Sequence, residues 1–540
     1  MRINTQNPNF MKITFRTLSF LVVLLPLMVS AQAGSYMNNP MVRVVMDTYA
    51  SLLRENPQDY VTYFNRAKEY YRHGDYNRAM DDLNEAIRYY PREEASDLSQ
   101  AYTIRGLIYE MWDKDEKALA DFNEAIILEP NSRYSLISRA DLLRDMKRYS
   151  EAKEDYQILL RRDVRCQEAY LGLAIIAYKE NNIGLCHENL KKAQDANPTN
   201  VDFYLTRAGI YEDMGEWRKA ADDYVMAMTF GDNRRSVAGI NALSAIAYEP
   251  VIEALSVAIE KADEKGFYYF IRGAIHMNNQ HYSASIKDWN TIIEKNMLHF
   301  HTVYYNRGFC YMRLGQFDYA VEDISAAIKM KGDQMAYYIT RSKLYRVMGD
   351  YESAKADIAV ASTFDMTHVD VLLQRAMLAM EQGNPEVALE HYNEALLCSA
   401  DNASLYLLRG DVYATLQDVD LAVRSYEMML NVYEEVPTFE SCRGFALARL
   451  GRMAEAEAWI EQVMQSIKGI PAPEDYYNAA CLYTHTGNKA MAYEYLEKAL
   501  KAGYGDYFNL YFEYDSPTSL ATLRNDIEFR ELVRNYSEMF

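Results

Sequence analysis

A column of small residues recurs along the chain at a fixed interval, and this interval limits the possible folds more than any other feature. Most steps between neighbouring members are 34 residues, as from Gly106 to Ala140 and from Gly308 to Ser342. The column comprises Ala67, Gly106, Ala140, Ala174, Ala208, Gly273, Gly308, Ser342, Ala376, Gly410, Gly444 and Ala480. A second small column lies twelve residues later and comprises Ala79, Ala118, Ala152, Cys186, Ala220, Ser285, Ala320, Ala354, Ala388, Ala422, Ala456 and Ala492. Two small residues per unit predict two helices whose backbones approach closely where they cross.

The residues between the two columns fit a helix–turn–helix unit. Apolar residues recur at helical spacing on both sides, and a glycine that can end the first helix often stands between them. These glycines are Gly74, Gly215, Gly315, Gly349, Gly383, Gly451 and Gly487. With 23 Gly and 13 Pro in 540 residues, the composition disfavours an all-β or loop-rich protein, and 49% apolar residues allow a large core. The sequence therefore predicts an all-α protein.

This repeat resembles the tetratricopeptide repeat in its 34-residue period and in its two small columns. The resemblance covers roughly residues 58–505 and implies a right-handed α-α solenoid, a superhelix of about thirteen helix–turn–helix repeats. The predicted organisation is a signal peptide (1–33), an N-terminal capping helix (34–57), the first half of the array (58–232), a degenerate repeat without the small-residue pair (233–265), the second half (266–505) and C-terminal capping helices (506–540).

A charged residue occupies the packing stripe of the first helix in most units. Arg307 lies between Tyr304 and Tyr311 at helical spacing, at a position where the family usually has a large apolar residue. The same column holds Arg66, Arg105, Arg139, Arg207, Arg272, Arg341, Arg375, Arg409 and Arg443. Seven of these arginines are followed sixteen residues later by an aspartate, at Asp82, Asp121, Asp155, Asp223, Asp288, Asp323 and Asp357. Because the two positions face each other in an antiparallel hairpin, we expect bidentate Arg–Asp pairs within each repeat.

The exceptions to this pairing are informative. One unit has Leu173 in the arginine column and Asn189 in the aspartate column, so both charges are absent together. In the last units Arg375, Arg409 and Arg443 lack a facing acid, and we expect them to use other partners or solvent. An alternative is that the column binds an acidic ligand, but an arginine already held by a carboxylate is poorly available.

No catalytic or metal-binding motif emerges from the sequence. The glycine-rich, HExxH and GxSxG patterns are absent, and the close pair His299 and His301 has no third ligand nearby. The six cysteines are far apart and form no CxxC pair. A formal net charge of −20 disfavours nucleic-acid binding. We therefore expect no enzyme activity, no cofactor and no metal.

The family resemblance implies that the first helices line a concave groove that binds protein or peptide segments. By position, the candidate partner-binding residues are Phe267, Phe270, Tyr305, Phe309, Arg313, Lys343 and Arg346, and aromatic and arginine side chains are common interface anchors. Asp202, Glu212 and Asp213 make a neighbouring stretch acidic, so a partner of mixed charge is expected. The alternative is that the aromatic residues only pack between repeats. Some members bind carboxylate termini with a Lys–Asn clamp, but the lysine position holds Phe64, Tyr305 or Ile339 here, so that function is not expected.

The N-terminus has the pattern of an export signal. Lys12 and Arg16 precede the apolar run Leu18–Val29, and small residues near Ala31 and Ala33 suit cleavage. The run is short for a membrane span, so a retained anchor is the weaker alternative and membrane contact is expected only if the signal is not cleaved. Met1 and Met11 are both possible starts. We expect a periplasmic or extracellular protein of a bacterial envelope.

Together these features favour a non-enzymatic protein-binding scaffold or adaptor of the cell envelope. The alternative is a glycan-binding envelope protein, which should expose a pair of parallel aromatic rings for sugar stacking. If the groove is not the partner site, the convex face or the Tyr-rich segment at residues 502–514 is the next candidate surface.

Overall fold

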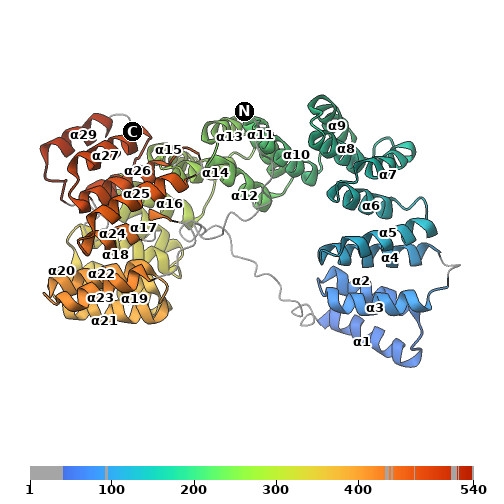
Figure 1. Cartoon of the computed structure of the whole chain (residues 1–540), viewed down its shortest axis with the longest axis horizontal. Coiled ribbons are helices and arrows are strands. Elements are labelled where there is room, and N and C mark those ends of the chain that lie inside the picture. The colour runs from blue at the N-terminus through green and yellow to red at the C-terminus, as the bar shows by residue number, and fades with distance from the viewer. Residues whose placement is uncertain are drawn as a thin grey trace. The chain divides into compact units, whose positions relative to one another are not determined.

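The computed structural model describes residues 40–91, 95–431, 437–439, 442–467, 469–511, 520 and 522–537 (Figure 1). The chain divides into two compact units, an N-terminal unit that ends at Ala254 and a C-terminal unit that begins at Leu255. This boundary lies inside the stretch 233–265, where the sequence pattern of the repeat fades.

All regular structure in the described ranges is helical, as the repeat predicts, and the ranges contain no strand. The helices of the N-terminal unit are α1 (Pro40–Glu55), α2 (Tyr60–Arg72), α3 (Tyr76–Tyr89), α4 (Ala95–Met111), α5 (Asp115–Leu128), α6 (Arg133–Asp145), α7 (Tyr149–Arg162), α8 (Gln167–Lys179), α9 (Ile183–Ala196), α10 (Val201–Asp213), α11 (Trp217–Thr229) and α12 (Asn233–Ser244). Helix α13 (Tyr248–Lys261) contains the boundary between the units.

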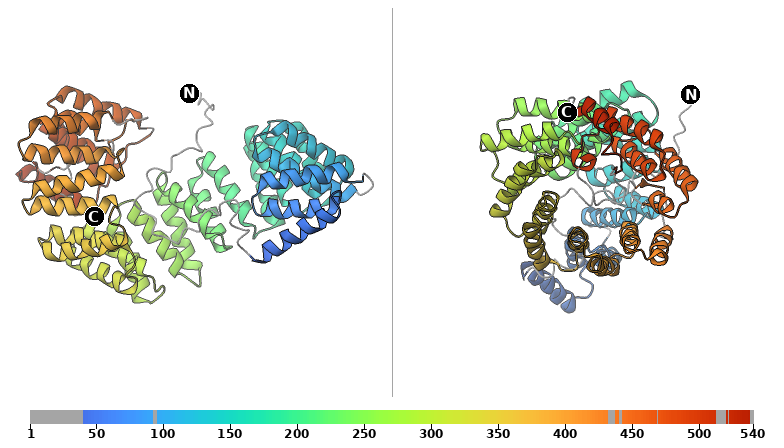
Figure 2. Two further views of the ribbon diagram at one scale, coloured as in Figure 1. Left: turned by 90° about the horizontal axis from the view of Figure 1, so that it is seen from below. Right: turned by 90° about the vertical axis from the view of Figure 1, so that its left-hand side faces the viewer.

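The C-terminal unit continues the same alternation. Its helices are α14 (Gly266–Asn278), α15 (Tyr282–Glu294), α16 (His301–Arg313), α17 (Phe317–Met330), α18 (Met335–Val347), α19 (Tyr351–Phe364), α20 (Val369–Glu381), α21 (Pro385–Cys398), α22 (Ala403–Thr415), α23 (Val419–Leu430), α24 (Arg443–Arg449), α25 (Met453–Ser466), α26 (Pro473–Thr486), α27 (Lys489–Lys501), α28 (Tyr507–Tyr511) and α29 (Ile527–Ser537). Within each unit, paired helices stack side by side along the chain, so the fold is a tetratricopeptide-type α-α solenoid (Figure 2).

The small columns lie where the two helices of a pair cross. Alanines in both columns are almost completely buried, for example Ala140 and Ala152 at 0% exposure. A Cβ atom on Gly308 of α16 would lie 2.9 Å from Cγ1 of Ile324 and 3.1 Å from the carbonyl oxygen of Ala320, both in α17. The close approach of the two backbones therefore requires small residues at this crossing.

The turn within each pair needs a residue with positive φ. The seven glycines identified in the sequence have φ between 71° and 80° at this point. Units without glycine place Asp113, Lys147, Asn181, Gln280 or Gln417 there, with φ between 55° and 63°. An L-residue other than Asn or Asp is strained in this conformation, so the turn at Lys147 carries a local energetic penalty.

Replacing Lys147 by glycine is expected to raise the free energy of unfolding by roughly 0.5–1 kcal/mol, because relief of the left-handed strain exceeds the entropy that glycine adds to the unfolded chain. Urea denaturation followed by circular dichroism measures this change. Asn181→Gly is the matched control and should change stability less, since asparagine tolerates the conformation. Equal effects at the two positions would show that strain at Lys147 is not the cause.

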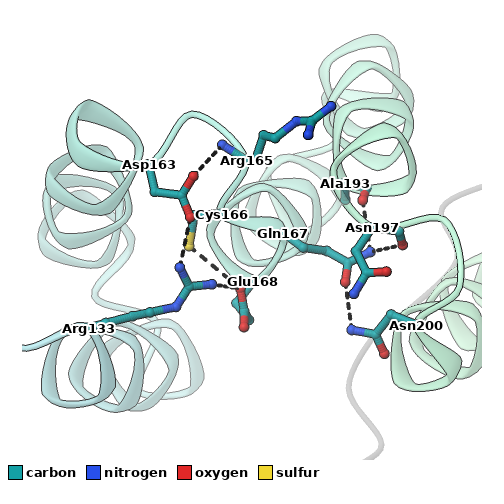
Figure 3. Close-up of polar contacts among 9 residues, drawn as sticks. All are labelled: Arg133, Asp163, Arg165, Cys166, Gln167, Glu168, Ala193, Asn197 and Asn200. Carbon is teal, nitrogen blue, oxygen red and sulfur yellow. Dashed lines mark hydrogen bonds and ion pairs between the residues drawn. The ribbon is translucent and has the colours of Figure 1, made fainter.

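Polar contacts also tie consecutive repeats together at the loop edge of the N-terminal unit (Figure 3). Arg133 of α6 donates to Asp163 Oδ2 at 2.9 Å and to Glu168 Oε2 at 2.7 Å, which links its repeat to the next one. Gln167 of α8 donates to the carbonyl oxygens of Ala193 and Asn197 of its own repeat, each at 2.8 Å, and its Oε1 accepts from Asn200, the N-cap of α10 in the next repeat, at 2.6 Å. The edge therefore reinforces the neighbour-to-neighbour coupling that stabilises a solenoid.

The degenerate stretch 233–265 contains the whole of α12 and α13. The sequence predicts that this stretch lacks the small-residue pair of a complete repeat. A Cβ atom on Gly239 of α12 would lie 2.2 Å from Tyr224 of α11, so α12 needs a glycine where it packs on the preceding helix. The stretch does lack an Arg–Asp pair, because its helices carry no arginine sixteen residues before an aspartate.

The ends of the array are only partly described. Helix α1 falls within the predicted cap 34–57, and α28 and α29 fall within the predicted cap 506–540. Ser516 and Pro517, the predicted start of a capping helix, and the predicted signal at residues 1–33 lie outside the described residues. Of the helices that are described, none is both long enough and apolar enough to span a bilayer.

Candidate functional site

The seven Arg–Asp pairs expected from the sequence are formed, and all are bidentate. Arg307 donates from Nε to Asp323 Oδ2 at 2.7 Å and from Nη2 to Asp323 Oδ1 at 2.6 Å. The same two contacts join Arg66 to Asp82, Arg105 to Asp121, Arg139 to Asp155, Arg207 to Asp223, Arg272 to Asp288 and Arg341 to Asp357. In the pair of Arg307 and Asp323, the side chains are 18% and 6% exposed. The pair therefore lies inside the repeat, where each charge depends on the other.

The surroundings of each arginine explain how a charge is tolerated on the packing stripe. The rings of Tyr304 and Tyr311 flank the guanidinium of Arg307, each with its centroid 5.8 Å away. Burial raises the pKa of Asp323, and Arg307 opposes this shift by hydrogen bonding to the carboxylate. The hydrogen bond to Asp82 likewise raises the pKa of Arg66. A stacked, doubly bonded guanidinium has few unsatisfied donors and is well suited to this site.

Most of these arginines also reach back to the preceding repeat, a contact that the sequence analysis missed. Nη1 of Arg307 donates to Asn290 Oδ1 of α15 at 2.8 Å. Equivalent contacts join Arg105 to Asn84, Arg139 to Asn123, Arg207 to Gln194, Arg272 to Ser256 and Arg341 to Ser325. A polar residue two positions after the aspartate, as at Asn84, Asn123, Asn290 and Ser325, was the available signal. The column thus links each repeat both internally and to its neighbour.

The arginines without a facing aspartate keep the link to the preceding repeat. Arg375 donates to Ser362 Oγ at 2.8 Å, Arg409 to Asn393 Oδ1 at 3.2 Å, and Arg443 to the carbonyl oxygen of Leu430 at 2.8 Å. Because protein groups hold these guanidinium groups as well, the arginine column is a structural feature and offers no ready site for an acidic ligand.

The seven candidate partner-binding residues lie on α14, α16 and α18 of the C-terminal unit. We call the surface of these three helices that carries them the first-helix face. A segment of the chain itself lies on this face: residues 504–511, which include α28 and which we call the C-terminal segment. The segment is deeply buried, with Asp506 at 3% and Phe508 at 0% exposure.

Arg313 makes the polar contact between the face and the segment. Its Nη1 donates to Asp506 Oδ2 at 2.5 Å and to Asn509 Oδ1 at 3.2 Å. Phe309 lies beneath this guanidinium, with 4.9 Å from the Arg313 Cζ atom to the ring centroid. The pair with Asp506 is largely shielded, since the two side chains are 21% and 5% exposed. Such a desolvated charge pair fixes the position of the segment on the face.

The apolar contact centres on Phe508. Its ring packs edge-on against Phe317 at a centroid distance of 6.0 Å, and Lys343 Nζ lies 4.7 Å from the ring centroid. Phe508 belongs to the same apolar cluster as Tyr305 and Phe309. A third contact comes from the turn before α15, where the amide of Gly505 donates to Gln280 Oε1 at 3.4 Å.

The other candidate residues serve packing between helices. Phe270 is 5% exposed and packs against Trp289, and Tyr305 stacks on Tyr337 at a centroid distance of 4.3 Å. Phe267 is half-buried beside Tyr268, with ring centroids 5.9 Å apart, and Arg346 is 2% exposed and pairs with Glu381. The prediction of an open groove around these residues is therefore wrong in part. The C-terminal segment covers part of the surface, and Phe270 and Arg346 are buried.

Because the C-terminal segment is bound to the first-helix face, a substitution there affects the stability of the fold as well as the binding of a partner. If Phe309 and Arg313 only contacted a partner, replacing both by alanine would weaken partner binding and leave the fold unchanged. Loss of Arg313 would instead leave the carboxylate of Asp506 buried without its cation, a change that destabilises proteins. The double variant therefore tests attachment of the C-terminal segment as much as binding of a partner.

The corresponding first helices of the N-terminal unit carry carboxylates that tyrosine hydroxyls hold in place. Tyr156 donates to Asp141 Oδ1 at 2.6 Å, and Tyr224 donates to Glu212 Oε1 at 2.7 Å. Burial raises the pKa of both carboxyl groups. Asp202 and Asp213 are exposed, and Asp202 accepts from Arg235 at 2.7 Å. The acidic stretch expected here is thus partly engaged in contacts within the protein.

Reactive and metal-binding groups do not assemble into a site in the part of the chain that the structure describes. No three His, Cys, Asp or Glu side chains group there as metal ligands, and His301 Nδ1 instead contacts Tyr337 Oη at 2.6 Å. Cys166 and Cys310 are fully buried, and burial raises the pKa of Cys310 to about 12. Such thiols are poor nucleophiles.

Parallel aromatic pairs occur, but protein covers them. In the pairs Tyr305–Tyr337 and Tyr477–Tyr504 at least one ring is buried, and the near-parallel rings of Tyr507 and Tyr511 are half-buried. Each of these pairs is at least half-buried in the protein, so they give the glycan-binding alternative no support.

Comparison with known proteins finds matches to a family of helical repeats in parts of the chain. Residues 61–93, 137–184, 301–334, 373–437 and 476–502 match models of the tetratricopeptide repeat. The BBSome complex member BBS4 of Bos taurus is 22% identical over 232 residues, which are 42% of this chain and 41% of that protein. The mitochondrial import receptor subunit TOM70 of Homo sapiens is 20% identical over 414 residues, 75% of this chain and 58% of that protein. The chain thus spans about half the length of these two relatives.

Two solved structures are among the matches. The Cut9–Hcn1 hetero-tetramer of the APC/C has a TM-score of 0.35 at 14% identity, with 85% of this chain and 94% of that chain covered. A tetratricopeptide repeat protein from Parabacteroides merdae has a TM-score of 0.27 at 17% identity and covers 53% of this chain and 98% of its own.

Proposed function

Because both units of this chain contain tetratricopeptide repeats, we propose that it is a non-enzymatic scaffold of the cell envelope that binds protein segments on the first helices of its repeats. The observation that carries this proposal is the C-terminal segment on the first-helix face. Arg313 of α16 binds its acid and Lys343 of α18 contacts its phenylalanine, so this surface has groups that can hold a polypeptide segment.

The names of two relatives support a role in binding other proteins. One relative is an import receptor subunit and the other is a member of a multi-protein complex. The envelope location rests on the N-terminal pattern, a basic start followed by a short apolar run and small residues. The proposed partners are proteins or peptides, and the first helices of the N-terminal unit are the surface left for them, since the chain's own end covers part of the C-terminal face.

Site-specific photo-cross-linking in intact cells tests this function. A photoreactive amino acid is placed at Met111 of α4 or Tyr134 of α6, which are 50% and 79% exposed on first helices. The matched controls are Ile127 of α5 and Leu185 of α9, which are 70% and 40% exposed on second helices. We expect the first-helix positions to capture the same identified protein, in the envelope fraction, and the second-helix positions to capture none of it.

Two outcomes would contradict the proposal. Equal capture of that protein by first and second helices would show that the partner does not select the first helices. Recovery of the full-length chain in the cytosolic fraction, with its N-terminal residues intact by mass spectrometry, would contradict the proposed location in the cell envelope.

A further inference from the structure

The C-terminal segment has two sets of contacts, and they lead to different parts of the C-terminal unit. One set joins the segment to residues on either side of it in the sequence. Tyr477 of α26 donates to the carbonyl oxygen of Asn509 at 3.1 Å, and Arg524 donates to the carbonyl oxygen of Leu510 at 2.8 Å. The rings of Tyr477 and Tyr504 stack at a centroid distance of 4.3 Å and an angle of 10°. These contacts hold the backbone of the segment and do not depend on which residues stand at positions 506 and 508.

The other set joins side chains of the segment to the first-helix face, and it is specific in chemistry. Arg313 selects an acid at position 506 and, through the same nitrogen, an amide oxygen at position 509. Lys343 and the apolar cluster of the face, together with Phe317 at the start of the adjoining α17, select an aromatic ring at position 508. The face thus recognises the pattern Asp-x-Phe-Asn, whose aspartate directly precedes α28 and whose other residues lie in its first turn.

The first-helix face presents two cations to the C-terminal segment of a chain whose formal net charge is −20. Arg313 lies over the ring of Phe309, and Lys343 lies over the ring of Phe508 of the segment itself. The acid bound by Arg313 is removed from water, and desolvated charge pairs with aromatic neighbours are typical of the residues that dominate binding. A foreign segment with the same pattern would find the same partners on this face.

We propose that the first-helix face is a recognition site for protein segments with an aspartate followed by phenylalanine two residues later and asparagine three residues later, and that the chain's own C-terminal segment occupies it until such a partner displaces the segment. The proposal rests on the proposed protein-binding function and names the class of partner. An attached segment competes at an effective concentration on the order of millimolar, so a partner binds only when it is abundant or makes additional contacts.

Peptide binding to a chain with a vacated face tests the proposal. In the full chain, residues 506–510 are replaced by a glycine–serine linker of equal length, and the probe is a fluorescent peptide with the sequence of residues 502–511. By fluorescence anisotropy we expect the peptide to bind this variant at least tenfold more tightly than the unaltered chain, because its site is no longer occupied. A peptide with Asp506→Asn and Phe508→Ala, and a chain that also carries Arg313→Ala, are the controls and should lose the binding.

Equal binding of the probe to the unaltered and vacated chains, or binding that persists with Arg313→Ala, would overturn the proposal. If circular dichroism shows that the linker variant does not fold, hydrogen exchange on the unaltered chain tests whether the probe peptide displaces the C-terminal segment. Excess probe should then increase exchange at residues 505–511, and the control peptide should not, whereas unchanged exchange would overturn the proposal. Cross-linking from Met111 and Tyr134 in the N-terminal unit is independent of this face, so failure of the inference leaves the proposed function separately testable.

Discussion

Replacing Asp323 by alanine is expected to lower the free energy of unfolding of the C-terminal unit by about 3 kcal/mol, because it leaves the guanidinium of Arg307 without its carboxylate inside the repeat. We place the effect at the lower end of the range for broken buried pairs for two reasons. Arg307 is still 18% exposed, and it keeps its contact with Asn290 of the preceding repeat. Urea denaturation and hydrogen exchange of α16 and α17 measure the loss.

The chain itself supplies the control for this prediction. One natural repeat has leucine and asparagine in place of the pair, at Leu173 and Asn189, and Asn189 is 6% exposed. The double variant Arg307→Leu/Asp323→Asn recreates that repeat and should recover most of the stability lost in Asp323→Ala, because no unpaired charge remains. If the double variant is as unstable as the single one, the cost does not come from a stranded charge.

Limited trypsin digestion is expected to cut the chain first between residues 233 and 265 and to leave two resistant fragments. The boundary between the two compact units falls in α13, and this stretch has no Arg–Asp pair. Arg272 of the next repeat does contact Ser256 of α13 at 2.8 Å, so one link of the arginine column remains. A solenoid opens where the coupling between neighbours is weakest, and we expect cleavage there at least about tenfold faster than inside complete repeats.

Two exposed lysines allow cleavage within 233–265 to be compared with cleavage within a complete repeat. Lys261 stands at the end of α13, and Lys147 stands in the turn between α6 and α7 of a repeat with a complete Arg–Asp pair. Mass spectrometry of early time points should find cleavage at Lys261 well before cleavage at Lys147. Similar rates at the two lysines would show that 233–265 is as well coupled as the rest of the array.

The helices, their turns and the Arg–Asp pairs could be predicted because the sequence repeats. A small residue every 34 positions marks each crossing, and glycine marks the turn, as at Gly315 with φ of 71°. Sixteen residues from arginine to aspartate place the two at equal distances from that turn, so local geometry alone brings them together. Each of these features lies within one helical hairpin, and the spacing along the chain therefore determines it.

The state of the candidate site could not be predicted in this way. Phe309 and Arg313 were correctly placed on one helix face by their positions in the repeat, but nothing in the spacing shows that Asp506, 193 residues later, meets Arg313. That contact depends on how the small rotations between successive repeats add up until the end of the C-terminal unit returns to α16. The sum of many inter-repeat rotations is a property of the tertiary structure, and it decided that the first-helix face of this unit is occupied by the chain itself.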